Sequence, residues 1–292
     1  MFSGSIVAIV TPMQADGAVD NGALDRLVEF HISHGTNAIV AVGTTGESPT
    51  LSVEEHIGVV RRIVQCAAKR IPVIAGTGSN STAEAIEQTE LARQAGADAS
   101  LSVTPYYNKP TQEGLYRHYK AIAEAVALPM ILYNVPGRTA CDLKPETVER
   151  LAAISNIVGL KEAPTIDRNR ELLNRVGGRI ALFSGDDDLA CESVLMGFQG
   201  VISVTANVAP RQVRAVIEAA LAGRKEEARR LDAALQVLHR AMFVESNPIP
   251  VKWALARMGL IGDGIRLPLT PLARPFHGQI VEALQLAGIA FA

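Results

Sequence analysis

The stretch AIVAVGTTGESPTLSVEEHIGVVRRIVQCAAK, residues 38–69, contains one complete strand–loop–helix unit. Its first six residues are almost all apolar, as in a strand buried on both faces of a parallel sheet. Its last seventeen residues place Ile57, Val60, Ile63 and Val64 on one side of a helix. The glycine-containing GTTGES between them is therefore predicted to be a loop that joins the end of the strand to the helix.

The same unit recurs along the chain. Apolar runs rich in β-branched residues alternate with stretches of helical spacing, such as residues 24–35 and 81–96. Eight such strands, each followed by a helix, predict an α/β fold of the (β/α)8 or TIM barrel type. The alternative is a doubly wound open sheet, but the sequence has no G-x-G-x-x-G turn. The predicted strands are residues 5–12, 38–43, 72–78, 99–105, 129–136, 157–163, 180–185 and 200–206.

The chain beyond the last predicted strand is rich in helical patterns. Residues 225–243, 247–259 and 278–288 have helical spacing, and no low-complexity linker separates them from the barrel. We therefore predict a catalytic barrel domain over residues 1–223 and a C-terminal helical domain over residues 224–292 that packs on it.

The composition argues against several classes of protein. The 292 residues are 48% hydrophobic with a net charge of −2, which gives no reason to expect nucleic acid or a membrane surface as partner. The opening residues, MFSGSIVAIVTP, lack the basic leader of a secretion signal. Three widely spaced cysteines indicate neither a disulfide framework nor a zinc site. We expect a cytoplasmic protein.

Lys161 lies at the end of the apolar run that begins at Ile157. Side chains alternate along a strand, so if Leu160 packs against the helices, Lys161 faces the barrel axis. Burial lowers the pKa of a lysine, and a neutral lysine is an amine nucleophile that forms an imine with a ketone. The imine is an electron sink for carbanion chemistry at the next carbon. The alternative is a lysine whose charge reaches the surface.

Other polar residues fall at the same rim, where barrel enzymes build their active sites. GTTGES, residues 43–48, offers hydroxyls and backbone amides that suit a carboxylate. Tyr106, Tyr107 and Tyr133 are placed to shuttle protons, and Arg138 is placed to hold a second carboxylate. The alternatives are an ordinary turn, packed tyrosines and a surface charge. The shared position of all these residues at one rim favours the functional interpretation.

The residue types at the rim argue against a metal and against phosphate. None of the six histidines falls at a predicted strand end, so imidazole ligands are missing there. The loop after the seventh strand carries Asp186, Asp187 and Asp188, which repel phosphate. These aspartates suit either Mg²⁺ or, as we prefer, the first turn of a helix. We expect no metal and no cofactor, pyridoxal phosphate included.

Seven motifs together resemble the 4-hydroxy-tetrahydrodipicolinate synthase family, formerly called dihydrodipicolinate synthase. The resemblance runs from the first strand to the last helices. It implies a (β/α)8 barrel with C-terminal helices, a homotetramer built as a dimer of dimers, and a lyase that condenses pyruvate with L-aspartate 4-semialdehyde in the diaminopimelate route to L-lysine. The motifs are GTTGES, VTPYYNKPTQEG, ILYNVPGRT, GLKEA, SGDD, GVISVTANVAP and ESNPIPVKWA.

The resemblance also implies roles for single residues. Lys161 would form the Schiff base with pyruvate, and Thr45 would hold the pyruvate carboxylate. Arg138 would receive the carboxylate of the semialdehyde. The chain departs from the family after KEA, where Pro164 begins PTID. The implied proton relay is Thr44, Tyr133 and Tyr107, with Tyr107 reaching a neighbouring subunit's site, and the implied lining of the pyruvate pocket is Gly185 and Ile202.

Lysine-sensitive relatives bind L-lysine at a subunit interface, and the resemblance gives matching positions here. Val53 and Pro49 replace residues of sensitive members, so we expect only partial inhibition at high lysine concentrations. The matching site residues are Ser48, His56, Asn80, Glu84 and Tyr106.

Two rival functions remain. A sibling aldolase, such as N-acetylneuraminate lyase or another 2-oxo-acid aldolase, would share the barrel and the Schiff-base lysine. Arg138 and the tyrosine pair favour the synthase, because a semialdehyde acid needs a second carboxylate anchor. The other rival is a metabolite-binding protein on an inactive barrel, which the presence of Lys161 and the tyrosines disfavours.

Overall fold

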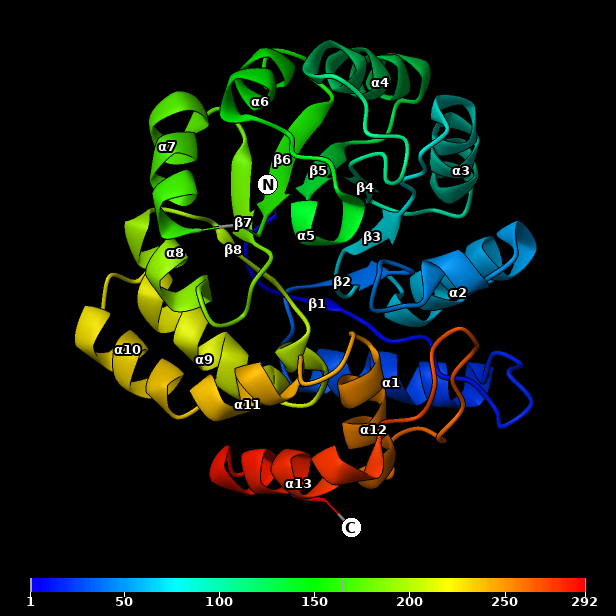
Figure 1. The fold of residues 1–292 in the computed structure, drawn as a ribbon, viewed down its shortest axis with the longest axis vertical. Helices are drawn as coiled ribbons and strands as arrows, with labels where there is room; N and C mark the ends of the chain where they lie inside the picture. Colours follow the sequence, from blue (N-terminus) through cyan, green and yellow to red (C-terminus); the bar gives the residue numbers. More distant parts are fainter. Residues whose placement is uncertain (1, 164, 292) are drawn as a thin grey trace.

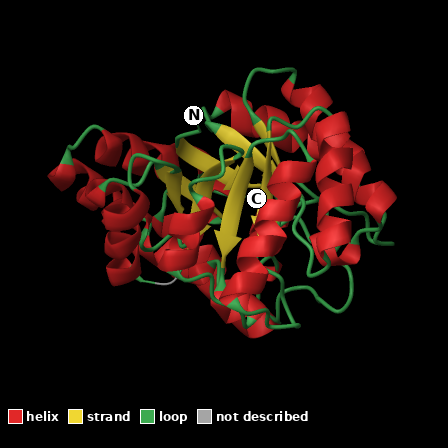
Figure 2. Cartoon of the chain, turned by 90° about the horizontal axis from the view of Figure 1, so that it is seen from above, coloured by secondary structure: helices red, strands yellow, loops and turns green. Residues whose placement is uncertain are grey.

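A computed structural model describes residues 2–163 and 165–291 of the chain. The predicted departure at Pro164 lies outside the described residues. The eight strands close into one parallel barrel in sequence order, with β1 paired to both β2 and β8, and the helices surround it (Figures 1 and 2). The predicted (β/α)8 barrel is therefore confirmed. The strands are β1 Gly4–Ala8, β2 Ala38–Ala41, β3 Val73–Gly76, β4 Ala99–Val103, β5 Met130–Asn134, β6 Ile157–Glu162, β7 Ala181–Ser184 and β8 Gly200–Ser203.

The helices that follow the strands form the outer layer of the barrel. Several begin at a side-chain cap: at α2, Ser52 accepts a hydrogen bond from the backbone of Glu55, whose carboxylate accepts one in return. The outer helices are α1 Asn21–Ser33, α2 Val53–Ala67, α3 Thr82–Gln94, α4 Gln112–Ala125, α6 Pro145–Leu151, α7 Ile166–Val176, α8 Ala190–Met196 and α9 Pro210–Leu221. The short helix α5 Pro136–Thr139 and the 3-10 turns η1 Ser48–Thr50 and η2 Thr205–Asn207 lie in the connections between strands and outer helices.

The last part of the chain is helical and packs on one side of the barrel (Figure 1). Helix α10 lies against α8 and α9, and α13 lies against α11 and α12. In the described residues, no helix is long and apolar enough to cross a membrane. The elements of this region are α10 Lys225–Ala233, α11 Gln236–Ala241, α12 Ile249–Arg257, η3 Arg274–Phe276 and α13 His277–Leu286.

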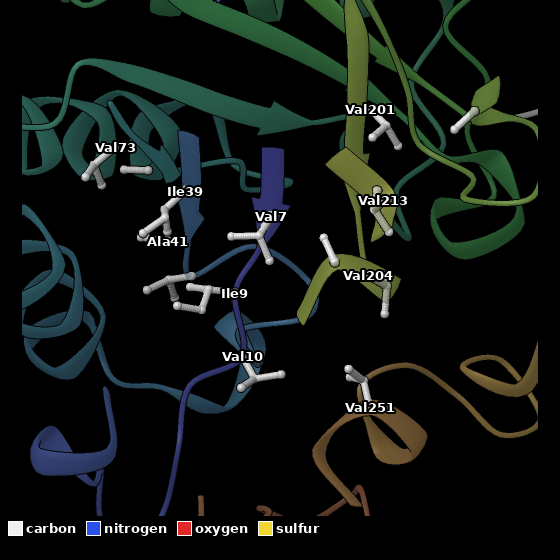
Figure 3. Close-up of a cluster of buried hydrophobic side chains, with 14 of the residues drawn as sticks. Val7, Ile9, Val10, Ile39, Ala41, Val73, Val201, Val204, Val213 and Val251 are labelled. Atoms are coloured by element: carbon white, nitrogen blue, oxygen red, sulfur yellow. The ribbon is translucent and has the colours of Figure 1, made fainter. Parts of the chain in front are cut away.

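Alternate residues of the strands supply two separate cores. Side chains such as Ile6, Val40 and Phe183 fill the barrel interior, whereas Val7 and Ile39 point outward into the larger core between the strands and the helices (Figure 3). Because adjacent strand residues face opposite cores, each strand must be apolar on both sides. The near-continuous apolar runs in the sequence have this origin.

Candidate active site

A cavity of about 60 Å³ lies at the carboxyl ends of the strands. Its lining comes from several strand ends and loops at the rim and from the segment that carries Phe243 and Asn247. The lining includes six of the residues singled out from the sequence, which are Thr44, Thr45, Tyr133, Arg138, Lys161 and Gly185, together with Asp186, Val204, Phe243 and Asn247.

Lys161 enters this cavity from the inner face of β6. Its neighbour Leu160 packs in the outer core, as the alternation along the strand predicts. Lys161 is only 5% exposed, and its Nζ lies 4.4 Å from the centre of the Tyr133 ring on the adjacent strand β5. The carboxyl group of Asp186, which also lines the cavity, is close enough to interact electrostatically with Lys161.

Gly185 allows the loop after β7 to approach Lys161. A Cβ atom at this position would lie 3.1 Å from Cε of Lys161 and 3.2 Å from the carbonyl oxygen of Glu162. The Gly185 N–H donates a hydrogen bond of 2.7 Å to that carbonyl. A side chain here would therefore press on the lysine and on the strand that carries it.

The GTTGES loop presents two hydroxyls to the cavity. Thr44 and Thr45 both line it, and Thr45 is almost fully buried. Oγ1 of Thr45 accepts a hydrogen bond of 3.0 Å from the side-chain amide of Asn247. Glu47 follows in the left-handed conformation, with φ of 58°. The loop therefore combines small hydroxyl side chains with a tightly turned backbone.

Arg138 stands at the exposed edge of the cavity. It follows β5 in the short helix α5, and its Nη2 lies 3.5 Å from the backbone oxygen of Asn247. Because Arg138 is exposed and lines the cavity, its guanidinium is available to a carboxylate.

The three aspartates after β7 have separate environments. Asp187 is buried and accepts hydrogen bonds from Ser203 and from the backbone of Val204 and Thr205. It therefore stabilises the turn after β8, whereas we expected the first turn of the next helix, which starts later, at Ala190. Burial, with Asp188 nearby, raises the pKa of Asp186 to about 6. Within the described residues, no cluster of three or more acidic, His or Cys side chains is suited to a metal.

Two predicted site residues lie away from this cavity. Tyr107 is 87% exposed and has a φ of 75°, so in one chain its ring points away from Lys161 into solvent. Ile202 is fully buried on the inner face of β8, where it pairs with Ile6 in the barrel core.

The sequence reasoning missed Asn247 and Phe243. Both come from the segment around α12 and line the cavity, although no strand end precedes them. Asn247 belongs to the ESNPIPVKWA motif, which contributed to the resemblance but received no role, whereas Phe243 lies just before that motif and had no sequence signal. In the described structure, Oδ1 of Asn247 is buried without a hydrogen-bond partner.

A second, wider cavity of about 290 Å³ adjoins the first and shares Thr44, Tyr133 and Arg138 with it. Ser48, His56 and Tyr106 of the predicted lysine site line this cavity.

Two residues of the predicted lysine site lie beside the wider cavity. The side chain of Asn80 donates to the backbone oxygen of Tyr106, and Glu84 accepts from Ser79. Nε2 of His56 donates a hydrogen bond of 2.7 Å to the carbonyl of Gly76, and burial lowers the pKa of His56.

Comparisons with known proteins agree along the whole chain. Residues 1–287 match the Dihydrodipicolinate synthetase family. A 4-hydroxy-tetrahydrodipicolinate synthase of Alkalilimnicola ehrlichii is 62% identical over 288 residues, which are 99% of both chains.

Two solved structures superpose on the barrel and its C-terminal helices. The dihydrodipicolinate synthase of Acinetobacter baumannii complexed with pyruvate has a TM-score of 0.98 and 58% identity, covering 99% of this chain and 100% of the other. The enzyme of Cyanidioschyzon merolae with lysine bound has a TM-score of 0.96 and 40% identity, covering 99% of each.

Proposed function

The chain belongs to the dihydrodipicolinate synthetase family, and we propose that it acts as a 4-hydroxy-tetrahydrodipicolinate synthase, condensing pyruvate with L-aspartate 4-semialdehyde. One observation supports this most directly: Lys161 is a nearly fully buried amine in a rim cavity that also contains hydroxyls and an arginine. The Acinetobacter baumannii relative is complexed with pyruvate, which supports pyruvate as a substrate of this chain.

The first half of the reaction uses pyruvate alone. Nζ of Lys161 attacks the keto carbon, and loss of water gives an imine. The hydroxyl of Thr45 and the backbone amides beside it receive the pyruvate carboxylate. Loss of a proton from the methyl group then gives an enamine. Tyr133, whose ring centre lies 4.4 Å from Nζ, carries the hydroxyl that we assign to this transfer.

The second half brings in the semialdehyde. Its carboxylate pairs with Arg138 at the cavity mouth, which directs the aldehyde towards the enamine carbon. Formation of the carbon–carbon bond restores the imine and leaves an alkoxide that takes up a proton. The amino group of the condensed substrate then attacks the imine carbon and displaces the Lys161 amine, which closes the ring of the product.

Borohydride trapping tests this function. Pyruvate plus borohydride should inactivate the protein permanently, and peptide mapping should find the label on Lys161. Lys161→Arg should lose the label and nearly all turnover, because arginine keeps its charge and forms no imine. A label on another lysine, or none, would remove the basis of the proposal. A parallel assay with N-acetylneuraminate separates the sibling aldolase, which should show no turnover here.

The proposal extends to assembly and location. We expect the protein to work in the cytoplasm as a homotetramer. In that assembly Tyr107, which is exposed in a single chain, would reach a neighbouring subunit's site and complete the proton relay with Thr44 and Tyr133.

The wider cavity is proposed as part of an L-lysine site. The supporting observations are the polar lining by Ser48, His56 and Tyr106 and the lysine-bound relative from Cyanidioschyzon merolae. Glu84 would pair with the lysine α-amino group. Val53 is half exposed and offers no polar contact, which supports weak inhibition. A lysine titration should give partial inhibition at high concentration, and tight, complete inhibition would show that Val53 is irrelevant.

A further inference from the structure

The GTTGES loop is held from outside the barrel by the C-terminal region. Glu47, two residues after Thr45, forms a buried ion pair with Lys252 of α12. The two residues are only 1% and 4% exposed. The second carboxylate oxygen of Glu47 accepts a bond of 3.3 Å from the backbone N–H of Arg266. The loop carboxylate is therefore surrounded by the last fifty residues of the chain.

The same region reaches the loop at a second point. Asn247, just before α12, donates from its side chain to Oγ1 of Thr45 at 3.0 Å. Helix α12 is itself anchored, because Val251 is fully buried in the outer core with Val10 and Val204 (Figure 3). The contacts on Glu47 and Thr45 thus come from a segment that the barrel core fixes.

The loop conformation is one that few sequences adopt unaided. Glu47 has a positive φ of 58°, which is strained for a residue with a side chain. Gly46 before it packs closely against the backbone of Val42, because a Cβ at position 46 would lie 2.8 Å from Cα of Val42. Such strain persists only where surrounding contacts fix the backbone.

A buried ion pair adds little net stability, because the desolvation of both charges offsets their attraction. Removing one partner is destabilising, whereas replacing both by uncharged groups of similar size is often tolerated. The pair between Glu47 and Lys252 is therefore poorly explained by stability alone.

We propose that Lys252 is a positioning residue for the first half of the reaction: through Glu47 it fixes the Thr45 hydroxyl and the loop amides where they receive the pyruvate carboxylate. The inference rests on the proposed function, since it assigns that carboxylate to this loop. Lys252 touches no substrate itself. Its loss should weaken pyruvate capture and leave the intrinsic reactivity of Lys161 in place.

The experiment uses Glu47→Gln/Lys252→Met, which leaves no unpaired buried charge, beside Lys252→Met alone. Borohydride trapping is measured as a function of pyruvate concentration in each protein. For the double variant we expect at least a tenfold rise in half-saturating pyruvate, with trapping at saturation within about twofold of wild type. Lys252→Arg, which keeps the charge, should recover part of the affinity.

The control is Glu55→Gln. Glu55 pairs with the side chain of Arg266 and so also joins the C-terminal region to the barrel, but it does not contact the loop carboxylate. Its half-saturating pyruvate should stay at the wild-type value. Wild-type capture by the double variant would overturn the positioning role, as would an equal rise in the control. Failure of the wild type to trap pyruvate at all would instead overturn the proposed function.

Discussion

Glu162 follows Lys161 on β6 and faces the opposite way, into a buried polar contact. It is 1% exposed, accepts from the side chain of Asn134 at 3.0 and 3.3 Å, and accepts from the backbone of Ala163. Burial, the largest cause, raises the pKa of its carboxyl to about 8. The folded protein therefore keeps Glu162 protonated at neutral pH, whereas the unfolded chain does not.

This shift predicts a pH dependence of stability. Below the unfolded value of 4.5 the carboxyl is protonated in both states, and its contribution is fully present. As pH rises towards 8 the unfolded state gains by ionising, so stability declines by up to about 1.4 kcal/mol per pH unit. Glu162→Gln should abolish this part of the decline. Urea unfolding of both proteins from pH 5 to pH 8.5 checks it, and parallel pH profiles would contradict it.

Arg138 is the residue on which the second substrate should depend. Arg138→Ala removes a charge-assisted contact worth about 1.5–3 kcal/mol, so KM for the semialdehyde should rise roughly tenfold to a hundredfold. Borohydride trapping of pyruvate should stay near wild type. Arg117→Ala, on the exposed face of α4 beside Glu113, is a surface control. Equal losses in trapping and turnover would mean that Arg138 shapes the whole site.

Residue-level inference from the sequence worked where strand geometry controls a side chain. The inward direction of Lys161 follows from alternation along β6, because Leu160 must pack outside. Asn247 was out of reach of the same reasoning, since its place in the cavity depends on how α12 docks on the barrel. Asn247 and Thr45 are 202 positions apart in the sequence, so their spacing does not predict the hydrogen bond between them.

The elements around the GTTGES loop depend on close backbone packing. A Cβ at Gly76 of β3 would lie 2.3 Å from the carbonyl oxygen of Val42, the residue before the loop. No change of side-chain rotamer relieves a clash with backbone, so Gly76→Ala must displace the strand or the loop.

Gly76→Ala should lower the free energy of unfolding by about 1–3 kcal/mol and raise half-saturating pyruvate. Gly58→Ala is the matched control, because Gly58 is on the exposed side of α2 with nothing within 4 Å of an added Cβ. It should gain about 0.5–1 kcal/mol. Chemical denaturation of both variants compares them, and a stable Gly76→Ala would show that the backbone yields.

The sequence predicted the eight strands because a double-sided core demands apolar runs. The helical spacing of residues 81–96 likewise predicted α3, whose first turn is capped by Ser81, a residue type that favours this position. The left-handed backbone of Val42 and Glu47 was not predicted, because valine and glutamate are not residue types that favour a positive φ. The role of Asp187 was also hidden, since it depends on the approach of β8 to β7.

The assembled molecule should be needed for full activity, if Tyr107 acts in a neighbouring subunit's site. Dilution should lower specific activity in step with the appearance of smaller species in sedimentation. Tyr107→Phe should slow turnover while the assembly persists, because the ring remains and only the hydroxyl is lost. A fully active monomer would contradict the shared site.

The contact between Glu47 and Lys252 also has a consequence for the time course of synthesis. During translation the loop emerges early, and β1 waits for its second neighbour until β8 has been made. At that point the carboxylate of Glu47 has been made, but its partner Lys252 lies 49 residues beyond Ser203, the end of β8. A ribosome-bound chain should therefore capture pyruvate only weakly until α12 has left the exit tunnel.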